Sequence, residues 1–533
     1  MGYTFEMKTI IYDTLNIAIK QLYGFSSVED VSFDVLTPPR SEFGDYSTNI
    51  SMILAKRLRR NPMDIAKEIV GAFGENAFCD RIEIISPGYI NIFLAHTFLC
   101  QRINTIVKNN HPYETDNRQK KSKNILIEFI SSNPTGPIHL GNARGGPSGD
   151  TLARVLEKMG HRVWREFYVN DCGKQIEVLG HSVLKDEESQ YAGSYIESLS
   201  QEKPEEIQDP YEVGMWASQQ ILETHIQPTC DKLDITFDAF FSEKSLHNDG
   251  SVQDMLEILR RKNFVYEKEN ALWYRSTNLG DDKDRVIIRS NGKPTYRLAD
   301  FAYHKNKIDR GFDTLITFLG ADHLGEAKEM QAFMDTVLEK SGVYFPVLTQ
   351  FVRVLREGKE VKMSKRQGTY YAMDDLIEEV GRDAVRFIFL SYDANSHITF
   401  DIDLAKEKSE KNPVYYVQYA HARIESIFEK SGALSDGAGN VELLSHTKER
   451  ELMVMLLRFT DLMEMIGENY EVHRLPHYAR SVADTFHSLY ASCRFIDTQN
   501  EDLSRARLIL ARATKIVLAQ TLYLCGVSAP SKM

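Results

Sequence analysis

The sequence predicts an α/β fold with a doubly wound parallel sheet, preceded by an α+β domain and followed by an all-α helix bundle. Three observations predict it. At 533 residues the chain is too long for one hydrophobic core and should form several domains. Strand-like apolar runs alternate with helical patterns through its middle, which is typical of a parallel sheet covered by helices. Beyond about residue 405 the periodicity is almost wholly helical.

The first 108 residues are predicted to form the α+β domain, because helical patterns are followed by two alternating strands across a turn at Pro87 and Gly88. The predicted helices cover residues 7–22 and 47–73, and the predicted strands cover 81–85 and 89–93. A polar stretch over residues 109–123 follows and predicts a linker.

The parallel-sheet domain is predicted over residues 120–390. Its clearest strands are 125–130, 163–169 and 314–319. The stretch at about 180–230 is rich in Glu, Gln and Ser with a weak helical pattern, and it is predicted to be an insertion. Residues 391–533 are predicted to form the bundle, with clear amphipathic helices at 452–466 and 506–524.

The composition indicates an ordinary soluble globular protein, with hydrophobic residues at 42% and charged residues at 26%, and the cytoplasm is the expected compartment because of the two absences named next. No run of about 18 uncharged apolar residues occurs and the first residues lack a signal or transit pattern, so no membrane partner is expected. The net charge of −12 argues against indiscriminate nucleic-acid binding but allows a local basic surface. The six cysteines form no Cys-x-x-Cys or Cys/His motif, so we expect reduced thiols and no metal site.

Two distant motifs indicate an ATP site built from separate segments. The first, residues 134–142, follows the strand at 125–130 and predicts a strand-to-helix turn whose glycines let the backbone approach a phosphate. The second, residues 362–366, carries two lysines before Gly368, and we expect a loop able to close over a polyphosphate. The alternative for the first motif is that His139 is a hydrogen-bonded structural residue. The alternative for the second motif is a solvated basic turn.

The chemistry of carboxylate activation fits these residues. Attack on an α-phosphate places negative charge on phosphate oxygens, which preorganised donors must stabilise. His139 and the turn amides can supply donors, and Lys362 and Lys365 can stabilise a departing pyrophosphate. Asn142 can donate a hydrogen bond but cannot become cationic. No Gly-x-x-x-x-Gly-Lys-Ser/Thr motif occurs, which excludes a P-loop ATPase.

These motifs resemble those of the class I aminoacyl-tRNA synthetases, and specifically of arginyl-tRNA synthetases of bacterial type. The segment from His139 to Asn142 is similar to the His-x-Gly-His signature, with Asn142 in place of the second histidine. Residues 362–366 are similar to the Lys-Met-Ser-Lys-Ser loop. The resemblance extends from Gly44 to Pro530. It implies a Rossmann-like catalytic domain, an amino-terminal tRNA-binding additional domain and an α-helical anticodon-binding domain.

The resemblance also implies the residues of the site. The implied catalytic residues are His139, Asn142, Lys362 and Lys365. The implied ATP-binding residues are Pro137, His139, Gly141, Asn142, Met363, Ser364 and Lys365. The implied arginine-binding residues are Ser131, Asn133, Glu243, Tyr296, Asp300, Asp322 and His323. The implied tRNA-binding residues are Tyr415, Tyr419 and Arg423.

Several of these residues have ordinary explanations without the resemblance. Tyr296 and Asp300 are four residues apart and could be a helix surface pair. The Asp-His pair at Asp322 is weak evidence for a metal ligand. The aromatic stretch 412–423 fits core packing as well as base stacking. For Glu243, in contrast, the residue type supports the resemblance. A buried guanidinium must pair its planar set of donors with an acceptor such as a carboxylate.

The implied function is ATP-dependent ligation of L-arginine to tRNA(Arg) through arginyl-adenylate, with release of AMP and pyrophosphate. We expect Mg²⁺ to accompany ATP, held chiefly by the phosphates, and we expect a monomer. The alternative is a non-catalytic RNA-binding paralogue of the same fold, which only Asn142 favours. A small-molecule nucleotidyltransferase is a third hypothesis, and the long helical carboxyl-terminal region counts against it.

Overall fold

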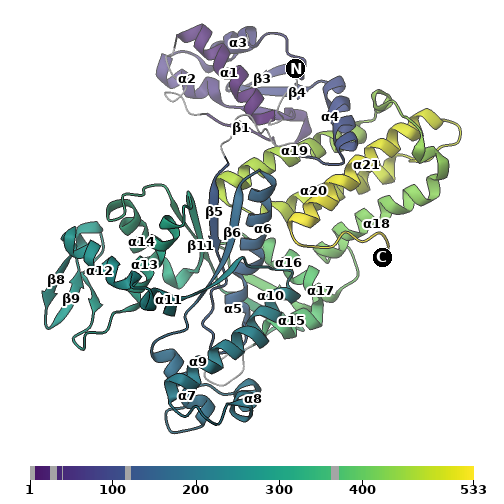
Figure 1. Cartoon of the computed structure of the whole chain (residues 1–533). Coiled ribbons are helices and arrows are strands. Elements are labelled where there is room, and N and C mark those ends of the chain that lie inside the picture. Colours follow the sequence, from purple (N-terminus) through teal and green to yellow (C-terminus); the bar gives the residue numbers. More distant parts are fainter. Residues whose placement is uncertain (1–6, 25–32, 39, 114–121, 362–370) are drawn as a thin grey trace.

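The computed structural model describes residues 7–24, 33–38, 40–113, 122–361 and 371–533. In Figure 1 they form a small amino-terminal unit, a central sheet with its helices, and a carboxyl-terminal helix bundle. The predicted fold class, an α/β domain flanked by an α+β domain and a helix bundle, is confirmed. Within the described part of the chain, no helix is both long and apolar enough to span a bilayer.

The amino-terminal unit is a four-stranded antiparallel sheet packed against helices. The sheet order is β1 (Val35–Leu36), β2 (Tyr46–Thr48), β4 (Tyr89–Leu94) and β3 (Cys79–Ile85), and the helices are α1 (Met7–Tyr23), α2 (Ile50–Leu58) and α3 (Pro62–Phe73). The prediction of helix throughout 47–73 is wrong, because β2 begins this stretch and Pro62 starts a new helix. Proline cannot donate an intrahelical hydrogen bond and suits the first helical position, where Asn61 caps the helix.

The central sheet contains five parallel strands in the order β12-β11-β5-β6-β7. The strands are β5 (Asn124–Glu128), β6 (Arg162–Val169), β7 (Ala239–Ser242), β11 (Thr314–Gly320) and β12 (Tyr344–Thr349). The chain first builds outward from β5 through β6 and β7, and then continues on the other side of β5 with β11 and β12. Because the winding reverses between β5 and β11, a ligand site is expected at their carboxyl ends.

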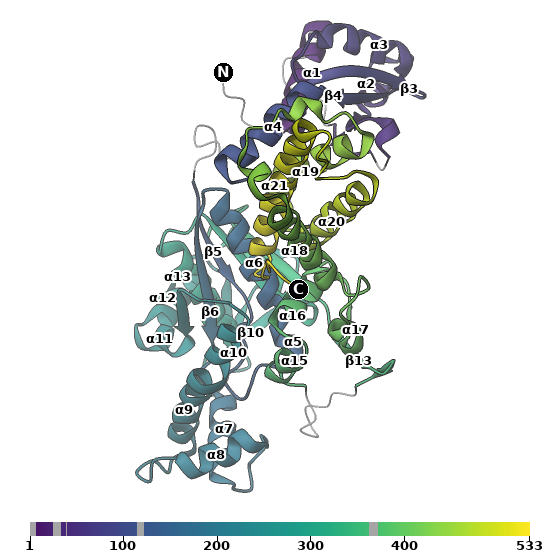
Figure 2. The same cartoon turned by 90° about the vertical axis from the view of Figure 1, so that its right-hand side faces the viewer.

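Helices connect the first strands. The short α5 (Leu140–Ala143) and α6 (Gly145–Lys158) join β5 to β6, and the connection from β6 to β7 contains α7 (Lys174–Leu184), α8 (Ser194–Glu202), α9 (Pro210–Ile221), a π-helical turn (Leu222–Ile226) and α10 (Gln227–Lys232). Helices α7 and α9 approach so closely that a Cβ on Gly180 would lie 1.6 Å from the carbonyl oxygen of Pro210. The region predicted as an insertion is therefore largely helical, and α7, α8 and α9 project from the sheet in Figures 1 and 2.

The connection from β7 to β11 in the chain supplies most residues of a second hydrophobic core. This connection contains α11 (Glu243–Asn248), α12 (Ser251–Arg261), the antiparallel strands β8 (Val265–Lys268), β9 (Ala271–Tyr274) and β10 (Arg285–Ile288), and α13 (Tyr296–Asp309). Phe301 of α13 stacks on Phe333 with ring centroids 4.1 Å apart. This core supports α11 and α13, which carry Glu243, Tyr296 and Asp300.

The remaining elements complete the catalytic part and form the bundle. They are α14 (Leu324–Thr336), β13 (Val352–Arg356), β14 (Lys359–Glu360), α15 (Met373–Val380), α16 (Arg382–Leu390), β15 (Ile398–Asp401), α17 (Ile402–Lys406), α18 (Pro413–Ser431), α19 (Thr447–Asn469), α20 (Arg474–Ser492) and α21 (Glu501–Leu524). The amphipathic stretches predicted at 452–466 and 506–524 lie within α19 and α21. Helix α4 (His96–Asn109) packs on these two helices and connects the amino-terminal unit to the bundle (Figure 2).

Candidate active site

A cavity of about 640 Å³ opens at the carboxyl ends of β5 and β11, where the winding of the sheet reverses. It brings together seven residues that the sequence analysis singled out. They are Ser131, Asn133, His139, Gly141, Asn142, Asp322 and His323. Pro137 is described by the structure but does not line the cavity. The first motif and part of the expected arginine site thus share one cavity.

His139 occupies the turn that the strand-to-helix pattern predicted. It is the N-cap of α5, and its Nδ1 accepts a hydrogen bond from the backbone N–H of Asn142 at 3.3 Å. Helix α6 then starts at Gly145, which also lines the cavity. The amino-terminal end of a helix carries a partial positive charge and free N–H groups, so this edge of the cavity suits an anion.

A strained backbone shapes the opposite edge of the cavity. Ile130 and Ser131 both have positive φ, 67° and 41°, a region that a β-branched residue rarely adopts. The hydroxyl of Ser131 donates to Glu128 at 3.2 Å and accepts from the backbone N–H of Tyr168 at 3.1 Å. Glu128 in turn pairs at 2.6 Å with the fully buried Lys307. Its charge is therefore already balanced within the protein.

The second motif, with Lys362, Met363, Ser364 and Lys365, lies outside the described residues. Its two flanks are described. The backbone N–H of Val361 donates to Val354 in β13, and on the other side Ala372 pairs with His139 in an isolated antiparallel bridge. The next N–H, of Met373, donates to the carbonyl of Ile138 at 2.9 Å. The chain that follows the second motif thus returns directly to the first motif.

A buried arginine holds the His139 turn against two further segments, at residues 350–351 and 393–396. Arg144, between α5 and α6, donates to the backbone carbonyls of Gln350, Phe351, Asp393 and Ser396. Burial lowers the pKa of Arg144 to about 10, so the side chain remains charged at neutral pH. Gln350 and Phe351 also line the cavity.

Glu243 and Asp300 do not line this cavity but lie close to Tyr168, which does. Burial raises the pKa of Tyr168 above its ordinary value, and the charges of these two carboxylates add to the effect. Glu243 is buried, and its Oε1 accepts a hydrogen bond from Cys172 Sγ at 3.1 Å. No lysine or arginine of the described residues forms an ion pair with Glu243, which distinguishes it from Glu128.

Tyr296 is linked to the cavity through a residue that the sequence analysis missed. It starts α13, so Tyr296 and Asp300 lie one helical turn apart. The Tyr296 side chain is exposed, and its hydroxyl donates to Glu326 Oε1 at 3.3 Å. The other oxygen of Glu326 contacts His323 Nδ1. Glu326 gave no motif signal, whereas Glu128 and Tyr168 lie near the carboxyl ends of the strands predicted at 125–130 and 163–169, where a ligand site is expected.

A second cavity, of about 940 Å³, lies in the helix bundle. Its lining includes the predicted tRNA-binding residues Tyr419 and Arg423, together with Tyr490 and Arg494, but not Tyr415. The guanidinium of Arg423 lies over the rings of Tyr419 and Tyr490, at 4.5 and 5.0 Å from their centroids. Tyr415 instead stacks on Tyr419, with centroids 6.2 Å apart. Aromatic faces beside cations suit unpaired bases.

The parallel sheet, the His-x-Gly-Asn turn at its switch point and the helical domain beyond it define a class I aminoacyl-tRNA synthetase. Sequence profiles of three families match the chain. They are the arginyl tRNA synthetase N terminal domain at residues 6–94, the class I (R) tRNA synthetase catalytic domain at 102–202 and 184–398, and the DALR anticodon binding domain at 417–533.

Curated relatives and solved structures agree with these profiles. The arginine–tRNA ligase of Thermotoga maritima is 40% identical over 97% of this chain and 98% of its own length, and that of Bacillus subtilis is 38% identical over 99% of both. The arginyl-tRNA synthetase structure from Thermus thermophilus has the same fold, with a TM-score of 0.79, 21% identity and coverage of 99% of this chain and 100% of that one. The chain belongs to the arginyl-tRNA synthetase family, and the predicted resemblance is confirmed.

Proposed function

We propose that the protein ligates L-arginine to tRNA(Arg) with ATP. In the first step a carboxylate oxygen of arginine attacks the α-phosphorus of ATP, which forms arginyl-adenylate and breaks the bond to the departing pyrophosphate. In the second step the 2′-hydroxyl of the terminal adenosine attacks the carbonyl carbon, and AMP leaves. Mg²⁺ enters with ATP as part of the substrate, held chiefly by the phosphates.

The observation that carries this proposal is that the buried Glu243 has no lysine or arginine partner among the described residues, but only His247 at 3.7 Å. Burying a carboxylate without a cation is costly, and two other buried carboxylates of the central sheet pair with a lysine or an arginine: Glu128 with Lys307, and Glu166 with Arg310. Glu243 has no such partner among the described residues. A guanidinium supplies the missing charge and several donors, so arginine suits this position better than a neutral side chain does.

The remaining arginine contacts follow from the position of Glu243. Asp300 is the second carboxylate beside Tyr168, and Tyr296 precedes it by one helical turn. Ser131 and Asn133 then face the α-amino end of the substrate, nearer to the His139 turn. Asp322 and His323 close the side of the cavity formed after β11. The substrate carboxylate would thus lie between the guanidinium site and the phosphate site.

The ATP site is proposed from the first motif and from the flanks of the second. His139, Asn142 and the backbone at Gly141 donate to phosphate oxygens, assisted by the start of α6. Lys362 and Lys365, with Met363 and Ser364 between them, stabilise the departing pyrophosphate. The bridge between Ala372 and His139 supports this arrangement because it leads the chain after residues 362–370 back to the phosphate-binding turn.

The tRNA is proposed to contact both ends of the chain. We assign residues 1–108 to the additional tRNA-binding domain, 120–390 to catalysis and 391–533 to anticodon binding. In the last of these, Tyr419 and Arg423 are proposed to stack on unpaired bases, with Tyr415 supporting the ring of Tyr419. One chain supplies every group named here, which is sufficient for a monomeric enzyme.

Arginine-dependent exchange between ATP and pyrophosphate tests the proposal, measured with and without bulk tRNA and with lysine and citrulline in place of arginine. We expect exchange with arginine, and little with citrulline, which has the shape of arginine but no positive charge. No exchange with any amino acid, together with tight tRNA binding, would favour the non-catalytic paralogue. In that case Asn142→His is the first variant to test for recovery.

A further inference from the structure

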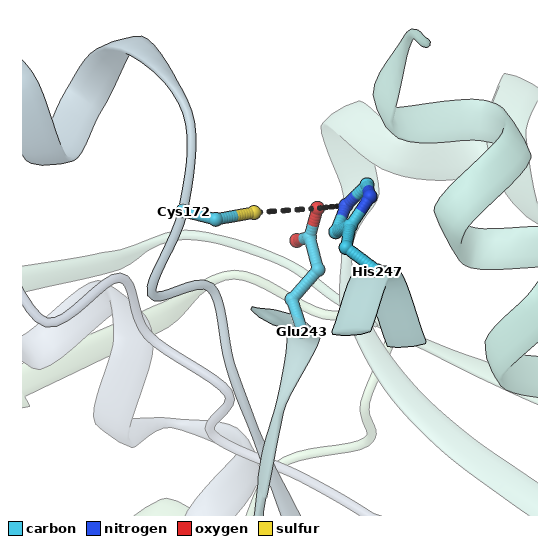
Figure 3. Close-up of side chains that lie close together, drawn as sticks. All are labelled: Cys172, Glu243 and His247. Carbon is cyan, nitrogen blue, oxygen red and sulfur yellow. Dashed lines mark hydrogen bonds and ion pairs between the residues drawn. The ribbon is translucent and has the colours of Figure 1, made fainter. Parts of the chain in front are cut away.

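Cys172, Glu243 and His247 form a compact cluster at the proposed guanidinium site (Figure 3). Cys172 lies in the turn between β6 and α7, whereas Glu243 and His247 lie one turn apart on α11. Glu243 Oε1 is 3.1 Å from Cys172 Sγ and 3.7 Å from His247 Nε2. One ligand atom from each residue lies within 4.8 Å of the others.

The two distances from Glu243 Oε1 are close to those between neighbouring ligands of a tetrahedral zinc site. With bonds of about 2.0 Å to oxygen and nitrogen and about 2.3 Å to sulfur, neighbouring tetrahedral ligands lie about 3.3–3.5 Å apart. The two distances given above bracket this range, so small side-chain rotations would complete the geometry. A sulfur, an imidazole nitrogen and a carboxylate oxygen suit zinc, whereas magnesium prefers oxygen ligands alone.

The backbone holds the two halves of the cluster together. The carboxylate of Asp171 accepts from the hydroxyl of Ser242 at 2.5 Å and from the backbone N–H of Lys244 at 3.0 Å. These bonds join the turn that carries Cys172 to the start of α11. Outer contacts of this kind keep metal ligands in position. Cys172 is half-buried and His247 is exposed, so an ion can reach the cluster from solvent.

We propose that Zn²⁺ binds to Cys172, Glu243 and His247, with water as the fourth ligand, and that it excludes arginine from the enzyme. The inference rests on the proposed function, because the competition requires Glu243 to accept the guanidinium. The Sγ–H proton leaves to solvent when sulfur binds the ion. Zinc and arginine would then supply alternative positive charges to the same buried carboxylate.

Cobalt(II) is a suitable probe because a cobalt–thiolate bond gives a charge-transfer absorption band that oxygen and nitrogen ligands do not give. The full-length protein is titrated with cobalt in the absence of ATP and tRNA, and then with zinc and with arginine. We expect the band to form, and to disappear when either zinc or arginine is added. Calorimetric titration with arginine should show an affinity at least about tenfold weaker when zinc saturates the protein.

Two variants and a matched control identify the site. Cys172→Ala should abolish the band, whereas Cys79→Ala, which removes a half-buried cysteine of the amino-terminal unit, should leave it unchanged. His247→Asn keeps the thiol and alters only an exposed side chain of α11. It should weaken cobalt binding by about tenfold or more, so the inference can be tested even if Cys172→Ala folds poorly.

The failures of the two proposals are distinguishable. No band in the unaltered protein, or an equal band in Cys172→Ala, would overturn the zinc site and leave the ligase activity untouched. A band that depends on Cys172 but does not respond to arginine would overturn the competition. Exchange activity measured without zinc tests the proposed function separately.

Discussion

Replacing Glu243 by glutamine tests arginine selection with the least structural change. The side chain keeps its shape, and the amide oxygen can still accept the hydrogen bond from Cys172. Only the charge and one acceptor are lost, and the amide N–H₂ group then faces the donors of the guanidinium. The carboxylate is only 8% exposed, so solvent and salt screen the lost interaction weakly.

The expected loss follows from the strength of hydrogen bonds to charged groups. A value of about 1.5–3 kcal/mol corresponds to an increase in KM for arginine of about 10- to 150-fold. The preference for arginine over citrulline should narrow by a similar factor, since citrulline carries no charge for Glu243 to recognise. The KM for ATP should stay unchanged, because Glu243 does not line the cavity beside His139.

The assay is ATP–pyrophosphate exchange in the presence of tRNA, with arginine, citrulline and ATP varied in turn. Glu339→Gln is the matched control, because it makes the same chemical change at an exposed ion pair with Lys262. This control should leave all constants unchanged. An unaltered KM and rate for arginine in Glu243→Gln would refute the assignment of Glu243.

Four further predictions concern other parts of the molecule. Asn142→His should change the KM for ATP little at neutral pH, since each side chain can donate a hydrogen bond to the phosphate. An exchange rate tenfold or more above that of the unaltered protein would contradict this prediction and show that a cationic group is needed at this position. Arg423→Ala should raise the KM for tRNA in aminoacylation while the KM for arginine stays constant. Arg386→Met should lower the free energy of unfolding, measured in urea, by about 3–5 kcal/mol, because three backbone carbonyls lose a donor and Asp150 keeps Arg154 but loses Arg386. Burial and the charge of Arg423 lower the pKa of His487 from 6.5 to about 4. Between these pH values the unfolded chain binds a proton that the folded protein does not, so the free energy of unfolding should fall by up to about 3 kcal/mol as pH decreases from 6.5 to 4. His487→Gln should flatten this pH dependence in urea unfolding curves.

Local patterns predicted the parts of the site that lie within one strand-to-helix turn. The apolar run at 125–130, the glycines after it and the helical pattern beyond them predicted the position of His139 in the turn after β5, where the structure has it. The helix predicted throughout 47–73 was wrong, because a continuous apolar pattern in this stretch concealed β2 and the helix start at Pro62. Periodicity reports the buried face of a segment, but it does not report how many elements share that face.

The cluster of Cys172, Glu243 and His247 could not be predicted from local sequence patterns. Cys172 and Glu243 are separated by 71 positions in the sequence, so no motif connects them. The parallel pairing of β6 with β7 brings Cys172 to Glu243. The assignments of Lys362 and Lys365 stay predictions, because these residues lie outside the described part of the chain.

Buried arginines hold distant segments of the catalytic part together, and the sequence does not reveal this function. Arg386 is fully buried in α16 and donates to Asp150 in α6, to the carbonyl of Leu233 and to the carbonyl of Cys525 at the end of the bundle. Carbonyls at the ends of helices lack partners within the helix, and a guanidinium offers five donors in a fixed plane. A buried arginine is therefore tolerated only where the surrounding acceptors take one particular arrangement.

Because a buried guanidinium needs its acceptors in one particular arrangement, it fixes the contact between two segments more precisely than apolar packing alone does. Arg144 joins the His139 turn to Gln350 and to the segment that ends at Ser396, and Arg450 joins α19 to Asp45 in the amino-terminal unit. Apolar surfaces can slide by a fraction of an ångström at little cost, whereas a shift of this size misaligns several hydrogen bonds of one guanidinium at once. A site assembled from segments far apart in the sequence needs such fixed junctions, because transition-state stabilisation depends on donors that are already in place when the charge develops.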